Sequence, residues 1–453
     1  MPINFLFISA VDSEKNIEVI FPSLGMAYLC SSLRARFGES AFSFKIIDKN
    51  VQHEIDTFKP DVIGISSVSQ NFGKAIEYAQ YAKKKGIPII IGGIHISMLP
   101  KSLVKEMDIG VIGEGEQTIC ELMDIFLSKK QFAPESLAPI NGIIYWNKNS
   151  ELAINEPREL IQDLDTIPQP ARDLLTINPE TYLFTSRGCP YNCIFCASTR
   201  FWKKVRFFSA EYVVNEIETL INVYHAKRIS FYDDLFVLDT KRLARIVELL
   251  EEKKLIGKAE FTCMLRANMV TNAIVEQLKK IGVTNIGMGL ESGSPKTLAY
   301  LKHNMKLEDS TKAINTIRKH GMRAYGSFII GAPQEEKEDI LDTLRFIKKS
   351  DLDGFDIYVL TPFPGTPIWD YASERGLVSD SLDWNHLDVT YSNPETAIIV
   401  SEKLSKEQIF GLVKKFKRYR VYRAIWRSLK NPKRVYYFLV KKIRYLKKYV
   451  GKS

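Results

Sequence analysis

The chain is poor in cysteine and lacks segments that would carry it into or across a membrane. Cysteine accounts for only six of its 453 residues, which is too few for a disulfide scaffold in a chain of this length. The first eight residues contain no basic stretch and no small-residue cleavage site, so we do not expect a signal peptide. No uninterrupted apolar run reaches the length of a membrane-spanning helix. We therefore expect neither a disulfide-rich secreted domain nor a membrane-spanning chain.

Acidic residues are missing from one end of the chain. Residues 411–453 contain sixteen Lys or Arg residues and no Asp or Glu, whereas the whole chain has a net charge of +10. The first 410 residues therefore carry a net charge of about −6. The basic character belongs to a tail, and the rest of the chain is long enough for two or three globular domains.

Half of the cysteines lie within one short run. Cys189, Cys193 and Cys196 follow the spacing C-x3-C-x2-C. Thiolates are soft ligands that suit iron–sulfur clusters. Three cysteines would bind three irons of a four-iron cluster and leave the fourth iron open. An open iron can bind a small chelating molecule and deliver one electron to it.

A zinc knuckle or a trio of buried thiols is the alternative interpretation of this run. Zinc normally takes four ligands, and neither a histidine nor a fourth cysteine lies nearby. The other cysteines, Cys30, Cys120 and Cys263, lie in apolar stretches and are expected to be buried thiols. Because a labile cluster needs reducing surroundings, we expect a cytoplasmic protein.

The first 135 residues alternate short apolar strands with helical patterns. This alternation predicts an α/β domain with a Rossmann-like, doubly wound parallel sheet. The predicted strands are residues 4–9, 44–48, 62–66, 88–92 and 109–112, and the predicted helices are residues 24–37, 73–85 and 116–127. Such sheets bind ligands beyond the carboxyl ends of their strands.

The loops at those strand ends are rich in small residues, which let a bulky ligand approach the backbone closely. No G-x-G-x-x-G follows the first predicted strand, so a nicotinamide cofactor is disfavoured. The candidate cofactor-binding residues in these loops are Ser66, Ser67, Ser69, Gly92, Gly93, His95, Gly113, Glu114 and Gly115. We interpret His95 as a pocket residue and not as a metal ligand.

A connector over residues 136–178 separates this region from a second one. It contains a predicted hairpin, residues 141–146 and 152–155, and a proline-punctuated linker. The alternation of strands and helices resumes over residues 179–400 and predicts a partial (β/α)6 barrel. Its predicted strands are residues 182–186, 228–232, 260–265, 285–288, 324–330 and 354–359.

Chemistry in such barrels occurs at the C-terminal ends of the strands, and the cysteine run directly follows the first predicted strand. Polar or small residues end the strands that follow. The candidates are Tyr232, Asp233 and Asp234 after the second strand, Arg266 after the third, Glu291 and Ser292 after the fourth, and Gly331 after the fifth. The two aspartates fit acid–base catalysis, helix capping or the binding of a cofactor's polar groups.

The cysteine run, with Phe195 just before its last cysteine, resembles the cluster loop of the radical S-adenosylmethionine (SAM) superfamily. In that superfamily the open iron chelates SAM, and one electron cleaves SAM to a 5′-deoxyadenosyl radical. Segments 287–294 and 326–333 resemble the superfamily's SAM-binding segments. The resemblance implies that the residues 232–234, Glu291 and Ser292 contact SAM, and that Gly331 lies on the adenine side.

The N-terminal region resembles the cobalamin-binding domain that precedes many radical SAM cores. The resemblance rests on segments 22–29, 60–66, 92–95 and 113–116. The motif D-x-H-x-x-G, by which other cobalamin enzymes supply a histidine to cobalt, is absent, so the lower cobalt ligand is not identified. The chain is similar to the family of the anaerobic magnesium-protoporphyrin ester cyclase and the hopanoid-modifying enzymes, which implies a [4Fe-4S] cluster, SAM and cobalamin as cofactors.

The resemblance implies a cobalamin-dependent radical SAM enzyme that modifies an unactivated carbon of a small or lipid-like substrate. We expect methyl transfer, with oxidative cyclisation or rearrangement as the alternative. A non-catalytic cobalamin or redox sensor is a second hypothesis from a different class. The enzyme would need an electron donor such as a flavodoxin or ferredoxin.

The tail, residues 401–453, carries aromatic and aliphatic residues at helical spacing, and Pro432 separates two predicted helices. A basic amphipathic helix fits peripheral contact with the inner face of a membrane. It also fits a solvated helix that packs its apolar face on the barrel. No RNA-binding fold is visible in the sequence, so we do not expect a nucleic-acid partner.

Overall fold

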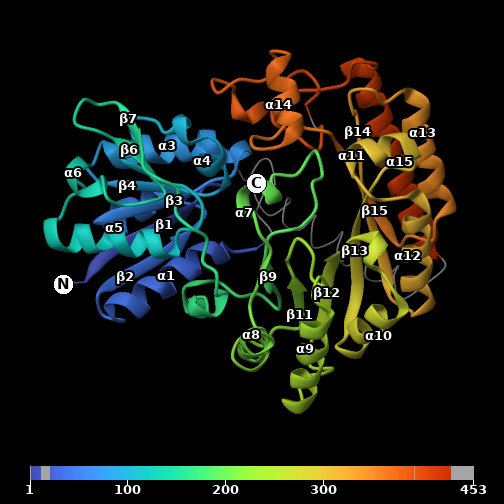
Figure 1. Cartoon of the computed structure of the whole chain (residues 1–453), viewed down its shortest axis with the longest axis horizontal. Helices are drawn as coiled ribbons and strands as arrows, with labels where there is room; N and C mark the ends of the chain where they lie inside the picture. Colours follow the sequence, from blue (N-terminus) through green and yellow to red (C-terminus); the bar gives the residue numbers. More distant parts are fainter. Residues whose placement is uncertain (1, 12–20, 392, 430–453) are drawn as a thin grey trace, which may run out of the picture.

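Two β-sheets flanked by helices form the molecule (Figure 1). The structure is a computed structural model that describes residues 2–11, 21–391 and 393–429. The expected mixed α/β fold with parallel sheets is confirmed. The first sheet and its helices contain the N-terminal residues, and the second sheet contains the residues that follow the connector.

The first sheet has the strand order β2-β1-β3-β4-β5-β6-β7, in which β1 to β5 run parallel. The strands are β1 (Ile3–Ser9), β2 (Phe42–Ile47), β3 (Val62–Ser66), β4 (Ile89–Gly92), β5 (Ile109–Val111), β6 (Ile143–Trp146) and β7 (Leu152–Ile154). Alternate residues of β1 enter different cores: Phe5 and Phe7 pack with one set of helices, and Leu6 and Ile8 with another. The sheet is therefore buried on both faces, as continuous apolar strands predict.

Helices α1 (Leu24–Phe37) and α5 (Glu116–Lys129) pack on one face of this sheet, and α2 (Val51–Phe58) and α3 (Phe72–Lys83) on the other. The short helices α4 (Ile94–Met98) and α6 (Pro134–Leu137) lie in the connections. The predicted hairpin of the connector exists, but it does not stand apart from the sheet. Strand β6 pairs antiparallel with β5, and β7 pairs antiparallel with β6, so the hairpin extends the first sheet.

The second sheet has six parallel strands in the order β15-β14-β13-β12-β11-β8. They are β8 (Glu180–Leu183), β11 (Arg228–Phe231), β12 (Glu260–Leu265), β13 (Val283–Glu291), β14 (Arg323–Ile330) and β15 (Gly354–Val359). Ile229 and Phe231 of β11 are buried against the helices, whereas Ser230 is half-buried on the opposite face. The helical side of this sheet therefore forms the apolar core, and the other side carries polar residues.

The helices that cover the second sheet begin where the sequence supplies N-caps. Ser209 accepts a hydrogen bond from the amide of Tyr212, and Asp239 accepts one from the amide of Arg242. Such caps satisfy amides that have no partner within the helix. The helices are α8 (Ala210–Asn222), α9 (Thr240–Glu252), α10 (Asn272–Lys280), α11 (Pro295–Leu301), α12 (Leu307–Lys319), α13 (Lys337–Lys349) and α14 (Pro367–Glu374).

A two-stranded ladder interrupts the chain directly after β8. Strand β9 (Ser186–Arg187) pairs antiparallel with β10 (Arg206–Phe207), and the chain between them contains the three cysteines and helix α7 (Ser198–Trp202). The first strand of the second sheet therefore ends earlier than the predicted residue 186. We call residues 188–205 the cluster loop, and β9 with β10 its stem.

Helix α15 (Lys406–Leu429) contains the first part of the basic tail. Ile409, Leu412, Val413 and Phe416 are buried in the core that contains β15, so this part of the helix packs on the second sheet. Pro432 and the second predicted helix lie outside the described residues. Among the described helices, none combines the length and the apolarity that a membrane crossing requires.

Candidate active site

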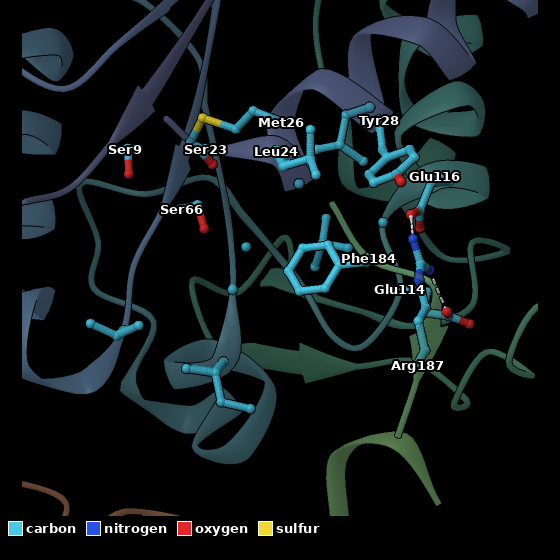
Figure 2. Close-up of a pocket in the computed structure, with 18 of the residues that line it drawn as sticks. Ser9, Ser23, Leu24, Met26, Tyr28, Ser66, Glu114, Glu116, Phe184 and Arg187 are labelled. Atoms are coloured by element: carbon cyan, nitrogen blue, oxygen red, sulfur yellow. Dashed lines mark hydrogen bonds and ion pairs between the residues drawn. The ribbon is translucent and has the colours of Figure 1, made fainter. Parts of the chain in front are cut away.

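A cavity of about 600 Å³ lies between the first sheet and the start of the second one (Figure 2). Its N-terminal wall is built by the carboxyl ends of β1, β3, β4 and β5, the edge at which parallel sheets bind ligands. Of the predicted loop residues, seven line it: Ser66, Ser67, Gly92, Gly93, Gly113, Glu114 and Gly115. The opposite wall includes Phe184, Arg187, Gly188, Trp202, Tyr232 and Asp234.

Glycine is required where the loops turn into the cavity. Gly93 has φ +98°, a conformation that other residues rarely adopt. A Cβ atom on Gly93 would lie 2.7 Å from the carbonyl oxygen of Ser67, so a side chain there would force the two loops apart. The wall is therefore smooth backbone on this side, which a broad ligand can approach closely.

His95 and Ser69 do not line the cavity. His95 is fully buried, its Nδ1 lies 3.0 Å from Ser69 Oγ, and its Nε2 lies 3.1 Å from Ser102 Oγ. Its ring stacks on Phe72 and meets the edge of Trp384. Burial lowers the pKa of His95 to about 3, which keeps the ring neutral. His95, predicted as a pocket residue, thus lies in α4 as a buried core residue next to the cavity wall.

The three cysteines are half-buried in the cluster loop. Burial raises the pKa of the Cys189 and Cys193 thiols and raises that of Cys196 to about 12. Polar groups nevertheless face two of the sulfur atoms. The amide of Ser198 lies 3.4 Å from Cys196 Sγ, and Arg266 Nη1 lies 3.8 Å from Cys193 Sγ. These donors would stabilise thiolate sulfur.

Arg266 lies outside residues 188–205 but contacts the cluster loop. Its guanidinium carbon lies 3.9 Å from the centre of the Tyr191 ring, and Nη2 donates to the carbonyl of His303 at 2.5 Å. The side chain is almost fully buried. The predicted position after the third strand thus brings a cation to the cysteines.

The two aspartates after β11 have different surroundings. Asp233 is buried and accepts hydrogen bonds from the amides and hydroxyls of Thr185 and Ser186, at distances of 2.6 to 2.9 Å. Its carboxylate therefore joins β11 to β9. Asp234 lines the cavity and accepts a hydrogen bond from the Ser198 hydroxyl, in the cluster loop. Of the pair, Asp234 is the one that a ligand can reach.

Glu291 also lies close to the cysteines, since its charge raises the pKa of Cys193 after the larger effect of burial. It has φ +58° and forms a buried ion pair with Lys302 at 2.9 Å. Ser292 is fully buried and shares a hydrogen bond of 3.0 Å with Thr343. Ser292 therefore holds the turn, and Glu291 and Lys302 form a buried charged pair beside it.

Gly331 has φ +88° and donates its amide to the Glu335 carboxylate at 2.6 Å. Glu335 was not identified from the sequence, although it follows the predicted segment by only a few residues. Glu116 lies within segment 113–116 but was not among the candidate residues, and Lys302 and Arg206 were not predicted either. Arg187 and Arg206, in the stem of the cluster loop, form ion pairs with Glu114 and Glu116 across the cavity edge, and Figure 2 shows those of Arg187.

Comparison with known proteins gives a consistent picture. Residues 183–347 match the radical SAM superfamily, and residues 15–123 match the B12 binding domain. An uncharacterized methyltransferase of Pyrococcus horikoshii is 34% identical over 406 residues, which cover 85% of this chain and 85% of that protein. The chain belongs to the radical SAM superfamily and carries a B12 binding domain. The family that the cysteine run and the N-terminal loops predicted is thereby confirmed.

Two further relatives of this radical SAM protein are informative. The anaerobic magnesium-protoporphyrin IX monomethyl ester cyclase of Rubrivivax gelatinosus is 23% identical, over 81% of this chain and 69% of the cyclase. The solved structure of the radical S-adenosylmethionine methyltransferase TsrM from Kitasatospora setae, with cobalamin and [4Fe-4S] cluster bound, has a TM-score of 0.66 at 17% identity. The superposition covers 83% of this chain and 75% of TsrM, which shows a shared fold.

The cluster loop of this radical SAM protein fits a [4Fe-4S] cluster. Such a cluster is bound through separate irons, each by its own thiolate, so its ligands are spaced and do not converge on one point. Among the described residues, no group of three or more His, Cys, Asp or Glu side chains is placed to hold a single ion. Cys189, Cys193 and Cys196 would be the ligands, with Arg266 beside one of them.

The cavity fits the B12 binding domain in the same way. Its N-terminal wall presents glycine and serine in the loops after β3, β4 and β5 together with apolar side chains such as Leu24 and Met26, and its other wall presents the aromatic side chains Phe184, Phe201 and Trp202. A flat ligand with polar edges would find backbone and hydroxyl groups on one side and apolar rings on the other. Ser66, Ser67, Gly93 and Gly113 are the residues that would hold it.

Proposed function

We propose that this protein is a cobalamin-dependent radical SAM methyltransferase. In the proposal, the cluster and SAM supply a 5′-deoxyadenosyl radical, and cobalamin supplies a methyl group to an unactivated carbon of a small substrate. Residues 1–135 hold cobalamin, and residues 179–400, as a partial (β/α)6 barrel, hold the cluster and SAM. The observation that carries the proposal is a cavity lined both by the B12 binding loops and by the stem of the cluster loop.

The chain's own residues would orient SAM at the cluster. Asp234 accepts a hydrogen bond from Ser198 of the cluster loop, Arg266 lies against Cys193, and Glu291 forms an ion pair with Lys302. Carboxylates and cations of this kind suit the amino and carboxylate groups of a chelated amino acid. The turn at Gly331, where φ is +88° and the amide donates to Glu335, would lie on the adenine side.

Aromatic side chains would give the reacting atoms apolar surroundings on one side. Phe184 and Phe21 pack around Tyr182, and Tyr232 meets Tyr182 at a ring-centre distance of 5.1 Å. This cluster lies where β8 and β11 meet the cavity, between the two cofactor sites. These rings would give a radical formed there apolar surroundings on the side of β8 and β11, and Tyr232 itself is 55% exposed.

Oxidative cyclisation is the second candidate, since a cyclase is among the relatives. Methyl transfer is favoured because the uncharacterized methyltransferase of Pyrococcus horikoshii is more similar to this chain than the cyclase is, at 34% against 23% identity. Protein with its cluster restored, reduced and supplied with cobalamin and SAM should release 5′-deoxyadenosine. Cys196→Ala should release none, whereas Cys120→Ala, a half-buried cysteine outside the loop, should behave as wild type. SAM labelled in its methyl group would then place label in the product of a methyltransferase and not in that of a cyclase.

A non-catalytic sensor would bind cobalamin and the cluster without cleaving SAM. Wild-type protein that holds both groups and yields no more 5′-deoxyadenosine than Cys196→Ala would favour the sensor.

We further propose a flavodoxin or ferredoxin as electron donor, and peripheral membrane contact through the tail. The second suggestion is supported by Val421, Tyr422 and Ile425 of α15, which are 56%, 63% and 48% exposed.

A further inference from the structure

The stem of the cluster loop carries two arginines side by side. In the β9–β10 ladder, Arg187 is the direct partner of Arg206. Like charges directly opposite each other in an antiparallel ladder repel. Both side chains are also nearly buried, with 10% and 5% of their surface exposed. Each guanidinium therefore needs a carboxylate, because an unpaired buried charge is strongly destabilising.

Both carboxylates come from the B12 binding domain. Glu114 accepts from Arg187 Nη1 at 2.5 Å through Oε1 and from Arg206 Nη1 at 2.7 Å through Oε2. Glu116 accepts from Arg187 Nη2 at 2.5 Å. Figure 2 shows Arg187 extended between the two glutamates. Two cations and two anions thus form a neutral, buried group that bridges the two halves of the chain.

Both carboxylate oxygens of Glu114 form hydrogen bonds within this bridge. Its Oε2 also accepts the amide of Ile161 at 2.8 Å, so both carboxylate oxygens are in use. Burial alone would raise the pKa of the Glu114 carboxyl, but the hydrogen bond from Arg206 and the charge of Arg187 outweigh burial and lower the pKa. The carboxylate is therefore charged and engaged, although the residue lines the cavity wall.

The bridge lies close to both cofactor sites. Glu114 and Glu116 follow β5 and frame Gly115 in the cavity wall. Arg187 precedes Gly188 and Cys189, the first cysteine. Gly188 has φ +95°, and a Cβ there would lie 2.5 Å from the carbonyl oxygen of Lys204, so the two ends of the cluster loop are in close contact. The position of the stem therefore determines where the first cysteine enters the loop.

We propose that Glu114, Arg187 and Arg206 are positioning residues that fix the cluster loop on the B12 binding domain. They keep the two cofactor sites at one separation across the cavity. This inference rests on the proposed pair of cofactors, but it does not depend on methyl transfer or on the substrate. Removal of the Glu114 charge would leave Arg206 without an ion pair beside Arg187, and the stem would separate.

The distance between the cluster and cobalamin can be measured by pulsed electron paramagnetic resonance in protein that holds both groups. The reduced cluster and cobalamin in its Co(II) state each carry an unpaired electron, so their coupling reports the distribution of distances. Wild type should give a narrow distribution. Glu114→Gln should give a broader one while retaining both groups, and Glu114→Gln/Arg206→Gln, which restores the charge balance, should return it towards wild type. Glu121→Gln, which loses an ion pair with Arg158 in the same domain, is the matched control and should stay narrow.

The outcomes are distinct. A distribution in Glu114→Gln as narrow as in wild type would overturn the proposal, as would a double variant no narrower than the single one. Arg187→Lys, tested in parallel, keeps the charge but cannot donate in one plane to both glutamates, and it should also broaden the distribution. If Glu114→Gln does not fold, a narrow Arg187→Lys distribution overturns the proposal by itself. Wild type that binds no cluster or no cobalamin contradicts the proposed function instead.

Discussion

Glu335, which was not predicted as a site residue, fixes the backbone of the predicted residue Gly331. It accepts the amides of Gly331 and Ala332 at 2.6 and 3.1 Å, and so holds the turn at the end of β14. The side chain is almost fully buried. Burial raises the pKa of the Glu335 carboxyl to about 7, against an ordinary value of 4.5. The residue therefore titrates in the range in which most enzymes work.

Glu335→Gln should change how stability depends on pH. The unfolded chain loses this proton near pH 4.5 and the folded chain near pH 7, so the folded state is favoured fully below pH 4.5 and loses this contribution as pH rises towards 7. A pKa difference of this size corresponds to about 3 kcal/mol. The wild-type free energy of unfolding should fall relative to that of the variant by up to this amount between pH 4.5 and 8. Denaturant unfolding at several pH values measures the free energy of unfolding of both proteins. If this free energy depends on pH in the same way in wild type and variant, the raised pKa of Glu335 is contradicted.

His95 provides a second test at the level of one side chain. Both of its ring nitrogens are hydrogen-bonded to serines, and it does not line the cavity. His95→Phe should cost about 2 kcal/mol, because Ser69 and Ser102 lose their partner. Bound cobalamin in the Co(II) state should keep the same electron paramagnetic resonance spectrum, without nitrogen splitting from the protein. Splitting that is present in wild type and absent in the variant would make His95 a cobalt ligand.

The residues that could be predicted from the sequence are those whose signal is local. The C-x3-C-x2-C spacing identifies the cysteines, and small residues after β3, β4 and β5 identify the cavity wall. Arg187 and Glu114 meet across 73 positions of the chain, and nothing in the neighbourhood of either indicates its partner. Their roles follow from the packing of two sheets, which no local pattern contains.

At the level of helices and strands, local sequence patterns predicted where strands form but did not predict which strands pair with each other. Strands β12 and β15 have the predicted bounds, because apolar and polar residues alternate along them between clear turns. The hairpin β6–β7 was also predicted, but its pairing with β5 was not. The pairing of the hairpin depends on which strand of the sheet has a free edge. The sequence of the hairpin itself does not indicate that strand.

Helix α15 has two apolar faces, and only one is used by the fold. Ile409, Leu412 and Phe416 are buried, and Arg423 donates to the carbonyls of Ser350 and Leu352 after α13. Val421 and Ile425 lie on the opposite side and are exposed. The interpretation of the tail as a helix whose apolar face packs on the rest of the fold is therefore confirmed for this helix, which packs on the second sheet. Its outer face, next to Arg418, is what an anionic surface would meet.

Val421→Glu/Ile425→Glu should abolish retention on vesicles that contain anionic lipid. Each change removes exposed apolar surface and adds a negative charge, so the attraction to anionic headgroups weakens. The folded state should lose little stability, since exposed positions contribute little to it. Vesicle co-sedimentation measures the effect, with neutral vesicles as reference. Thr311→Glu/Asn315→Glu adds the same charge on exposed positions of α12 and should leave retention unchanged. Equal retention of all three proteins would exclude α15 as the contact.

At the level of the whole molecule, one apolar core runs from the first sheet into the second. It joins Ile63 and Ile91 of the first sheet to Ile329 of β14 and to Trp369 and Trp384 of the C-terminal segment. Trp384 meets the edge of His95, at a ring-centre distance of 4.5 Å, and lies 6.1 Å from Trp369. The sequence predicted two units and a linker. Because this core spans both sheets, we expect both halves to open together.

Trp384→Ala should therefore loosen both halves of the molecule and not only the segment that contains it. Removal of a large buried ring costs about 3–5 kcal/mol, and the Trp384 ring packs with Phe72, His95 and Trp369. Hydrogen exchange read by mass spectrometry gives the free energy of opening of each segment. Peptides from β3 and from β14 should lose protection by a similar amount. Trp146→Ala, a half-buried tryptophan at the far edge of the first sheet, should loosen β6 and β7 and spare β14. If Trp384→Ala deprotects β3 while β14 keeps its wild-type protection, the halves are independent units, and the separation of the cofactor sites rests on the Glu114 bridge without help from the core.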